Sequence, residues 1–456
     1  MARVAIVNLA SMSMPGNEPI FPIGARAVQA ALDRAGHVTR LIDFVEDPNA
    51  HADLSWAAAG WDIIGFSIRN IDPIDLACDG FVPHYEAFVQ RVRAAAGSPA
   101  PVLVGGGPGY SLFGEPLLRR IGFDVGVVGP GEQSMLAIAA DPERYRRYGT
   151  NVRGERHPGF MTEVLKHPGS LMQTYARSAG AMIGVEAKRK TCYQECVYCP
   201  YAYISGDNQG DLKPLALLEQ ELRGIHAAGI RRVFFTDAIF NSELRYAKQV
   251  VSLIAKLALP DLTWSAYFAP RPFDDEFAEL LAASGIEAVH LSPDSLDVGM
   301  MDRLGKRFDT RHVTRFIERC RRHDLQMRIS VVFGGPGENE ESVRTSARYA
   351  NAQLRPEDLV LNVGFRVLPA TALARQLGLP DEHLVEPTFY PFDPQLFTWI
   401  IEHFDSRFMH SNRLLHLMVD NIASKKMVKV PHGCSAQSTP HTSLPYLALT
   451  RRSPDG

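Results

Sequence analysis

The stretch Lys190-Thr-Cys192-Tyr-Gln-Glu-Cys196-Val-Tyr-Cys199-Pro-Tyr201 carries three of the six cysteines of the chain. Their spacing is C-x3-C-x2-C. Three thiolates on one short loop can bind three corners of a cuboidal iron–sulfur cluster, and one iron then stays open for another ligand. A structural zinc ion usually takes a fourth Cys or His from a second pair, which this stretch lacks. We therefore expect Cys192, Cys196 and Cys199 to hold a [4Fe–4S] cluster.

The sequence around this motif alternates strands with helices. The expected strands are Met182–Val185, Arg232–Phe235, Thr263–Phe268, Ala288–Ser292, Met327–Phe333 and Val360–Val367. Amphipathic helical patterns lie between them, at Leu215–Ala228, Arg245–Leu257 and Arg311–His323. This alternation predicts a parallel sheet covered by helices, and six strands suit a partial β/α barrel better than a full eight-stranded one. The cysteines follow the first of these strands.

The residues upstream repeat the alternation. The expected strands are Arg3–Leu9, Val38–Phe44, Asp62–Ile68, Pro101–Val104 and Asp124–Val128, with helices at Ala25–Ala35 and around Tyr85–Ala95. The pattern predicts a doubly wound, Rossmann-like α/β domain, in which ligands bind at the carboxyl ends of the strands. We expect this domain at residues 1–145, a linker at 146–178, the partial barrel at 179–375 and a mixed, helical extension at 376–456, with a helix at Phe397–Phe408.

Composition excludes several classes of function. Hydrophobic residues make up 46% of the 456 residues and charged residues 22%, as in a soluble globular protein. The net charge of −3 provides no broad basic surface for nucleic acid or an anionic membrane. Residues 1–10 predict a first strand and no signal peptide, and no run of ~18 apolar residues predicts a membrane span. The scattered Cys78, Cys320 and Cys434 form no disulfide framework, so we expect a cytoplasmic protein.

The cysteine motif at the end of a first barrel strand resembles that of the radical S-adenosylmethionine superfamily. Tyr198 stands at the aromatic position, whose backbone in that family contacts the adenine. Thr236 and Asp237 stand where the family binds the methionine amino group, although the family's glycine pair is missing here. The resemblance implies that the open iron and these residues bind S-adenosylmethionine.

Later strand ends extend this resemblance. Ser292 ends the fourth barrel strand, Leu304-Gly-Lys306 resembles the segment that follows it, and Gly334-Gly335-Pro-Gly-Glu338 resembles the loop after the fifth. We expect Ser292, Gly334 and Gly335 to contact the cofactor. The alternative for the glycine-rich loop is an ordinary tight turn.

Two glycine-rich motifs in the first domain point to a second cofactor. Gly105-Gly106-Gly107-Pro and Gly129-Pro-Gly131-Glu132, placed ahead of such a barrel, resemble the cobalamin-binding class of these enzymes. Glycines let the backbone approach a bulky cofactor closely, although they also suit helix-entry turns. The resemblance implies that cobalamin binds to these motifs and to the loop Ser67-Ile-Arg69-Asn70.

Arg69 departs from the histidine-ligated cobalamin proteins. Those proteins carry a D-x-H-x-x-G motif, which does not occur here. A guanidinium has donors only and stays protonated, so it cannot ligate cobalt. Under the corrin ring, Arg69 would keep water and side chains off the lower face and favour release of a methyl group as an electrophile. Alternatively, Arg69 pairs with the cofactor's phosphate or with Asp72.

Cluster, S-adenosylmethionine and cobalamin together imply methyl transfer through methylcobalamin. The whole chain, including the Ser67–Asn70 loop, resembles the tryptophan 2-C-methyltransferases of thiopeptide (quinaldic acid) biosynthesis, which methylate C2 of L-tryptophan by a non-radical route. The indole N–H proton then needs a base, either the carboxylate of S-adenosylmethionine or Asp237. A protein electron donor or a small reductant is a possible partner.

Three residues are candidates for the substrate site: Tyr201, Tyr267 and His290. Aromatic residues on strands more often belong to the core, and so does a strand histidine. Three other functions stay open: radical methylation of an unactivated carbon in another natural-product intermediate, a radical cyclase or methylthiotransferase without methylcobalamin, and a non-catalytic carrier of either cofactor.

Overall fold

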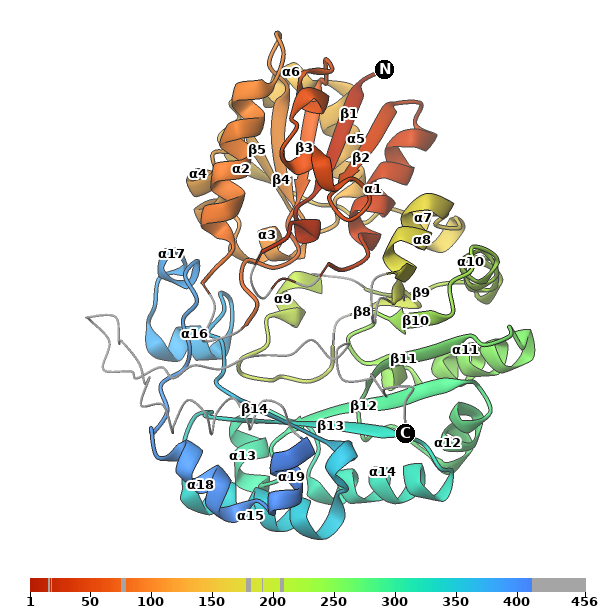
Figure 1. Cartoon of the computed structure of the whole chain (residues 1–456), viewed down its shortest axis with the longest axis vertical. Coiled ribbons are helices and arrows are strands. Elements are labelled where there is room, and N and C mark those ends of the chain that lie inside the picture. The colour runs from red at the N-terminus through yellow and green to blue at the C-terminus, as the bar shows by residue number, and fades with distance from the viewer. Residues whose placement is uncertain are drawn as a thin grey trace.

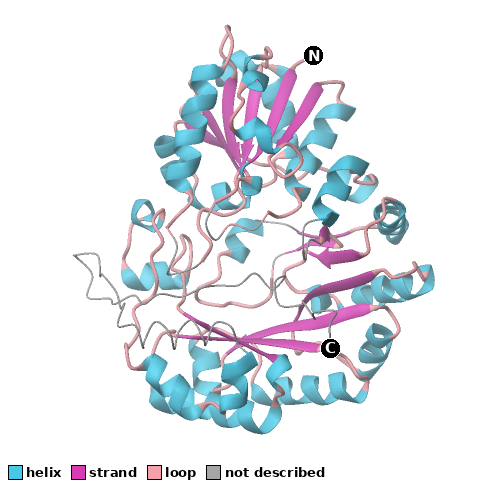
Figure 2. Cartoon of the chain, viewed as in Figure 1, coloured by secondary structure: helices cyan, strands magenta, loops and turns pink. Residues whose placement is uncertain are grey.

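The computed structural model describes residues 1–14, 17, 19–74, 79–177, 182–190, 192–205 and 209–411. Two α/β units follow one another along the chain, one above the other in Figure 1 and Figure 2. The expected α/β class with two parallel sheets is confirmed. Cys78 and Cys434 lie outside the described residues.

The first unit contains a six-stranded parallel sheet in the order β2-β1-β3-β4-β5-β6. Its strands are β1 (Arg3–Asn8), β2 (Val38–Asp43), β3 (Ile63–Ser67), β4 (Val102–Gly106), β5 (Val125–Val128) and β6 (Thr150–Arg153). The first five agree with the expected strands, whereas β6 arises from the stretch expected to be a linker. The strand order reverses between β1 and β3, and open α/β sheets bind ligands beside such a reversal.

Helices cover both faces of this sheet. They are α1 (Ile23–Arg34), α2 (Val82–Ala95), α3 (Pro108–Phe113), α4 (Glu115–Ile121), α5 (Glu132–Ala140) and α6 (Pro142–Tyr145), followed by α7 (Gly159–Thr162) and α8 (Gly169–Arg177). The central strand β3 is apolar at successive positions because both of its faces are buried, with Ile63, Ile64 and Phe66 at most 2% exposed.

The second unit is an open barrel of six parallel strands in the order β14-β13-β12-β11-β10-β7. The strands are β7 (Ile183–Val185), β10 (Arg232–Phe235), β11 (Thr263–Phe268), β12 (Ile286–Asp294), β13 (Met327–Phe333) and β14 (Leu359–Val363). The helices between them are α10 (Leu215–Ala227), α11 (Leu244–Leu257), α12 (Asp275–Ala282), α13 (Val298–Arg303), α14 (Thr310–Arg322) and α15 (Glu340–Gln353). The predicted partial barrel is therefore confirmed.

Smaller elements complete the described chain. A two-stranded antiparallel sheet pairs β8 (Lys188–Lys190) with β9 (Gln209–Leu212), and α9 (Tyr201–Ser205) lies between the two units in Figure 1. The C-terminal helices are α16 (Ala372–Leu377), α17 (Asp381–Leu384), α18 (Leu396–His403) and α19 (Ser406–Ser411). The short 3-10 helices of the described chain are Leu9–Ser11, Pro48–His51, Ser55–Ala58, Phe240–Ser242 and Pro356–Asp358. The single helix expected at 397–408 is broken because Phe404 is extended. Within the described ranges, no helix is long and apolar enough to cross a membrane.

Candidate active site

The cysteine motif forms the loop between β8 and α9. Cys192, Cys196 and Cys199 are free thiols, and the Cys199 amide donates to the Cys196 carbonyl at 3.1 Å. Burial and the neighbouring Cys196 raise the pKa of the Cys192 thiol. Three such thiols suit the irons of a [4Fe–4S] cluster, and metal binding displaces their protons. In the part of the chain that the structure describes, no three His, Cys, Asp or Glu side chains lie close enough to hold a metal, so cluster binding requires the three sulfurs to converge.

The segment after β12 holds this loop from the barrel side. The Val197 amide donates to the Leu304 carbonyl at 3.1 Å, and the Arg307 amide donates to Gln194 Oε1 at 2.8 Å. Gly305 has a φ of +76°, and a Cβ there would lie 2.3 Å from the Glu195 carbonyl oxygen. The backbone can therefore approach the cysteine loop this closely only because residue 305 is a glycine.

Lys306 is a buried cation beside the cysteine loop. Its ammonium donates to the Tyr198 hydroxyl at 3.1 Å and to the Ser292 carbonyl at 2.9 Å, and it forms an ion pair with Asp294. Burial opposes the charge, but Asp294 and Cys196 outweigh it and raise the pKa of Lys306. The network fixes the Tyr198 side chain beside the cysteines. The role of Lys306 was not predicted from the sequence, although its place after the fourth strand was a signal.

Asp237 is 3% exposed and acts as an anchor. Its carboxylate accepts from the Lys188 amide at 2.7 Å and the Ala187 amide at 3.3 Å, which ties the end of β10 to the strand before the cysteines. Burial is the main cause that raises the pKa of Asp237 to about 6, against the opposing effect of Lys188. The neighbouring Thr236 is exposed, and its amide donates to the Val185 carbonyl at 2.9 Å.

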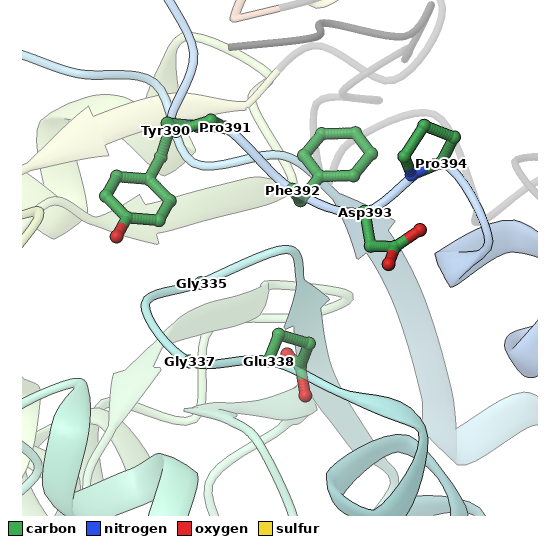
Figure 3. A pocket seen from close by; sticks show the side chains of 8 residues that line it. All are labelled: Gly335, Gly337, Glu338, Tyr390, Pro391, Phe392, Asp393 and Pro394. Carbon is green, nitrogen blue, oxygen red and sulfur yellow. The ribbon is translucent and has the colours of Figure 1, made fainter. Parts of the chain in front are cut away.

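The loop after β13 borders a pocket of about 430 Å³, which the segment 390–394 closes on its other side (Figure 3). Gly335 and Gly337 line it, and both Gly334 and Gly337 have positive φ, as a tight turn requires. Glu338 also lines the pocket, and its buried Oε2 has no hydrogen-bond partner among the residues that the structure describes. Burial raises the pKa of Glu338 to about 7. The loop is thus both a turn and the wall of a pocket with an unsatisfied acceptor.

The loop 67–70 follows β3 at the reversal of strand order in the first unit. The glycines after β4 pack against it: a Cβ on Gly107 would lie 2.5 Å from the Ile68 carbonyl oxygen, and one on Gly109 2.6 Å from that of Arg69. A Cβ on Gly105 would lie 2.4 Å from the Phe123 ring. These close approaches involve the chain itself and not a ligand. The glycine-rich motif therefore shapes the loop that carries Arg69.

Arg69 is exposed on this loop and lies close enough to Tyr85 and Tyr267 to interact electrostatically with both. In the amide orientation that satisfies both its oxygen and its nitrogen, the Asn70 side-chain oxygen accepts a hydrogen bond from Arg69 Nη1 at 3.2 Å. Asp72 instead pairs with Arg366 at 2.9 Å, so it does not serve as the partner of Arg69. Arg69, a side chain of the first unit that can only donate hydrogen bonds, thus lies near Tyr267 on barrel strand β11.

Tyr267 and His290 lie side by side on β11 and β12, with their ring centroids 5.9 Å apart. His290 is 7% exposed, and burial, with a smaller effect of Arg328, lowers its pKa to about 4. Its imidazole is therefore neutral near pH 7. Arg69, Tyr267 and His290, predicted from separate motifs, lie in one region. Tyr201 lies elsewhere, near Asp237 and Cys192.

The second glycine-rich motif contacts strand β8, which precedes the cysteine loop, through its acidic residue. Gly129 and Gly131 form the turn into α5, where the Gly129 amide donates a hydrogen bond to the Ser111 hydroxyl oxygen at 3.0 Å. Glu132, 7% exposed, forms an ion pair with Arg189 at 3.0 Å, and Arg189 also pairs with Glu186 at 2.9 Å. Arg189 belongs to β8, directly before the cysteines. This link between the two units was not predicted from the sequence.

Comparison with known proteins agrees with this geometry. Residues 190–350 match the Radical SAM superfamily, so this part of the chain is a radical SAM domain, as the cysteine motif predicted. The chain is also 25% identical to the tryptophan 2-C-methyltransferase of Streptomyces laurentii over 438 residues, which cover 79% of this chain and 72% of that protein.

Two solved structures show the fold. One is the radical S-adenosylmethionine methyltransferase TsrM from Kitasatospora setae with its tryptophan substrate and the analogue aza-SAM bound; it has a TM-score of 0.78 and 21% identity, over 90% of this chain and 91% of that one. The other is TsrM with cobalamin and a [4Fe–4S] cluster bound, with a TM-score of 0.72 and 23% identity, over 83% and 78% of the two chains. The arrangement of a Rossmann-like domain before a radical SAM domain is therefore that of TsrM.

Proposed function

We propose that the chain is a cobalamin- and [4Fe–4S]-dependent methyltransferase that moves a methyl group from S-adenosylmethionine to C2 of L-tryptophan by a polar route. The observation that supports this most is the position of Arg69 on the loop at the strand reversal, close enough to Tyr267 of the barrel to interact with it electrostatically. The similarity to a tryptophan 2-C-methyltransferase over 79% of the chain supports the same reaction.

The residues present suit both cofactors. Cys192, Cys196 and Cys199 would hold the cluster, whose open iron supplies a binding point for S-adenosylmethionine. The loop 67–70, which contains no imidazole, would lie beneath cobalamin, and cobalamin supplies a cobalt able to accept and release a methyl group. S-adenosylmethionine would extend from the open iron along Tyr198 and the loop after β13.

Arg69 would control the lower face of the corrin. Its guanidinium offers five donors and no lone pair, so it excludes water and side-chain ligands without replacing them. A metal without a lower ligand releases a methyl group more readily to a nucleophile. The indole ring of tryptophan is such a nucleophile, which makes the polar route chemically consistent with this side chain.

The barrel residues would hold the substrate. The neutral His290 and the Tyr267 hydroxyl can each donate or accept a hydrogen bond from the polar groups of an amino acid. Of the two candidate bases, Asp237 already accepts from two backbone amides. Its engagement favours the carboxylate of S-adenosylmethionine as the group that removes the indole N–H proton.

We further propose that the enzyme works in a reducing, cytoplasmic environment with a small reductant or a protein electron donor. The three motif cysteines and Cys320 are free thiols, as reducing conditions require.

An anaerobic reconstitution tests the proposal. The purified chain is loaded with iron, sulfide and cobalamin and then incubated with methyl-labelled S-adenosylmethionine and L-tryptophan. We expect labelled 2-methyltryptophan without 5′-deoxyadenosine. Formation of 5′-deoxyadenosine in proportion to product would replace the polar route by the radical one. A chain that binds the cluster but no cobalamin, or that leaves tryptophan unmethylated, contradicts the proposed function.

A further inference from the structure

Arg366 lies just after β14 and is 4% exposed. Its Nη1 donates to the Val367 carbonyl at 2.6 Å and its Nη2 to the Leu384 carbonyl at 2.7 Å. Its Nε donates to Asp72 Oδ2 at 2.9 Å. One guanidinium therefore joins the end of the barrel, the end of α17 and a loop of the first unit. Asp72, its partner on that loop, lies 294 positions earlier in the chain.

Asp72 stands three positions after Arg69, on the same loop. The side chains of Arg366 and Asp72 are 2% and 4% exposed, so the ion pair is shielded from water. Shielded charge pairs are held tightly because separation leaves both ions desolvated and unpaired. Asp72 Oδ1 also accepts from the Ile74 amide at 2.9 Å, which fixes the carboxylate relative to its own backbone.

The opposite side of the same loop rests on the glycines after β4. The Gly109 amide donates to the Ile68 carbonyl at 3.0 Å, and the Ile68 amide donates to the Gly106 carbonyl at 2.8 Å. Tyr85 adds a hydrogen bond from its hydroxyl to the Asn70 carbonyl at 3.0 Å. The loop is thus held by its own domain on one side and by Arg366 of the barrel on the other.

We propose that Arg366 is a positioning residue that, through Asp72, holds the Arg69 loop at the height at which the guanidinium of Arg69 shields the lower face of bound cobalamin. This inference rests on the proposed function, because it assumes that cobalamin binds above this loop. It adds that the barrel, and not the cobalamin domain alone, determines the coordination of the cobalt.

A second ion pair between the first unit and the segment that follows the barrel strands provides a matched control. Arg120 of α4 pairs with Glu386, which lies close in sequence to the carbonyls that Arg366 contacts. The Arg120 and Glu386 side chains are 33% and 58% exposed. Within the described chain, their ion pairs join them to each other and Arg120 to Glu86, and none involves residues 67–72. Exposed pairs contribute little, so Glu386→Gln removes an interdomain charge pair without releasing the loop.

The experiment compares Arg366→Met, Asp72→Asn and Glu386→Gln with the wild type as full-length, reconstituted enzymes. Asp72→Asn keeps the shape of the side chain and serves where Arg366→Met fails to fold. Hydrogen exchange of residues 67–74 is measured without cobalamin, and the electron paramagnetic resonance spectrum of the bound, one-electron-reduced cobalamin is recorded. This spectrum distinguishes a cobalt with a lower axial ligand from one without.

We expect exchange of residues 67–74 to rise at least about tenfold in the two variants of the pair and to stay at the wild-type rate in Glu386→Gln. We also expect the fraction of cobalt with a water ligand to rise in the same two variants only. Unchanged exchange would overturn the claim that Arg366 holds the loop. Faster exchange with unchanged cobalt coordination would overturn the positioning role. A wild-type enzyme that binds no cobalamin refutes the proposed function, while the exchange rates still decide whether Arg366 holds the loop.

Discussion

Gly109→Ala should push directly on the Arg69 loop. The new Cβ would lie 2.6 Å from the Arg69 carbonyl oxygen and 2.8 Å from its carbonyl carbon, whereas ordinary contacts begin at 3.4 Å. The loop must therefore move by about 0.8 Å, and such overpacking costs about 1–3 kcal/mol. Alanine gains at most about 1 kcal/mol of helix propensity within α3. The net expectation is a loss of stability of about 0–3 kcal/mol.

Gly24→Ala is the matched control, because Gly24 lies in helix α1 and a Cβ there would meet nothing within 4 Å. It should stabilise the chain by up to about 1 kcal/mol. Denaturant unfolding measures both variants, and hydrogen exchange of residues 67–74 shows whether the loop has moved. Equal effects of the two substitutions, with unchanged exchange in the loop, would refute the argument that the glycine is required for the close approach to Arg69.

Three further predictions follow from the same contacts. Cys199→Ala should lower the iron and sulfide content of the reconstituted protein. Cys320→Ala should leave this content unchanged, because Cys320 is a buried core residue. Equal iron content in the two variants would contradict the assignment of Cys199 to the cluster. Gly305→Ala, with a Cβ 2.3 Å from the Glu195 carbonyl oxygen, should reduce cluster loading without removing a ligand, and full loading would show that the loop yields easily. Burial, with Arg26 and Lys213, lowers the pKa of His167 from 6.5 to about 3. The neutral imidazole therefore contributes its full stability above pH 6.5, and this contribution is lost as the pH falls below 6.5. Between pH 7 and pH 5, the free energy of unfolding in urea should fall by up to about 2 kcal/mol less in His167→Phe than in the wild type.

The strands could be predicted from the sequence because both sheets are parallel and buried on both faces. Buried strands form continuous apolar runs, such as Ile63–Phe66, and such runs are visible without a structure. Strand β6 escaped prediction because its sequence, Thr150–Arg153, is polar, with none of its residues fully buried. Its place in the sheet depends on pairing with β5, a long-range interaction that leaves no local pattern.

Some residues of the candidate site could likewise be predicted from a local motif, whereas others depend on long-range contacts. The cysteines and Arg69 were recognisable because their chemistry is local to a motif. The role of Lys306 was not, since it depends on Asp294 and Tyr198 from two other segments. The cofactor contact expected of Glu132 stays a prediction, and its ion pair with Arg189 of β8 could not be foreseen, because it joins two segments 57 positions apart.

Two ion pairs link the two units beside the loops that the proposed cofactors would contact. Asp72, on the loop of Arg69, pairs with Arg366, and Glu132 pairs with Arg189 of β8, directly before the cysteines. In the proposed reaction, each unit would thus position a cofactor loop of the other. For a methyl group to pass between two cofactors, their separation must be set to within a fraction of an ångström. The Arg366–Asp72 pair resists a shift of either unit, because separation would leave two desolvated charges unpaired, and the Glu132–Arg189 pair adds a second link at which Glu132 would lose its partner.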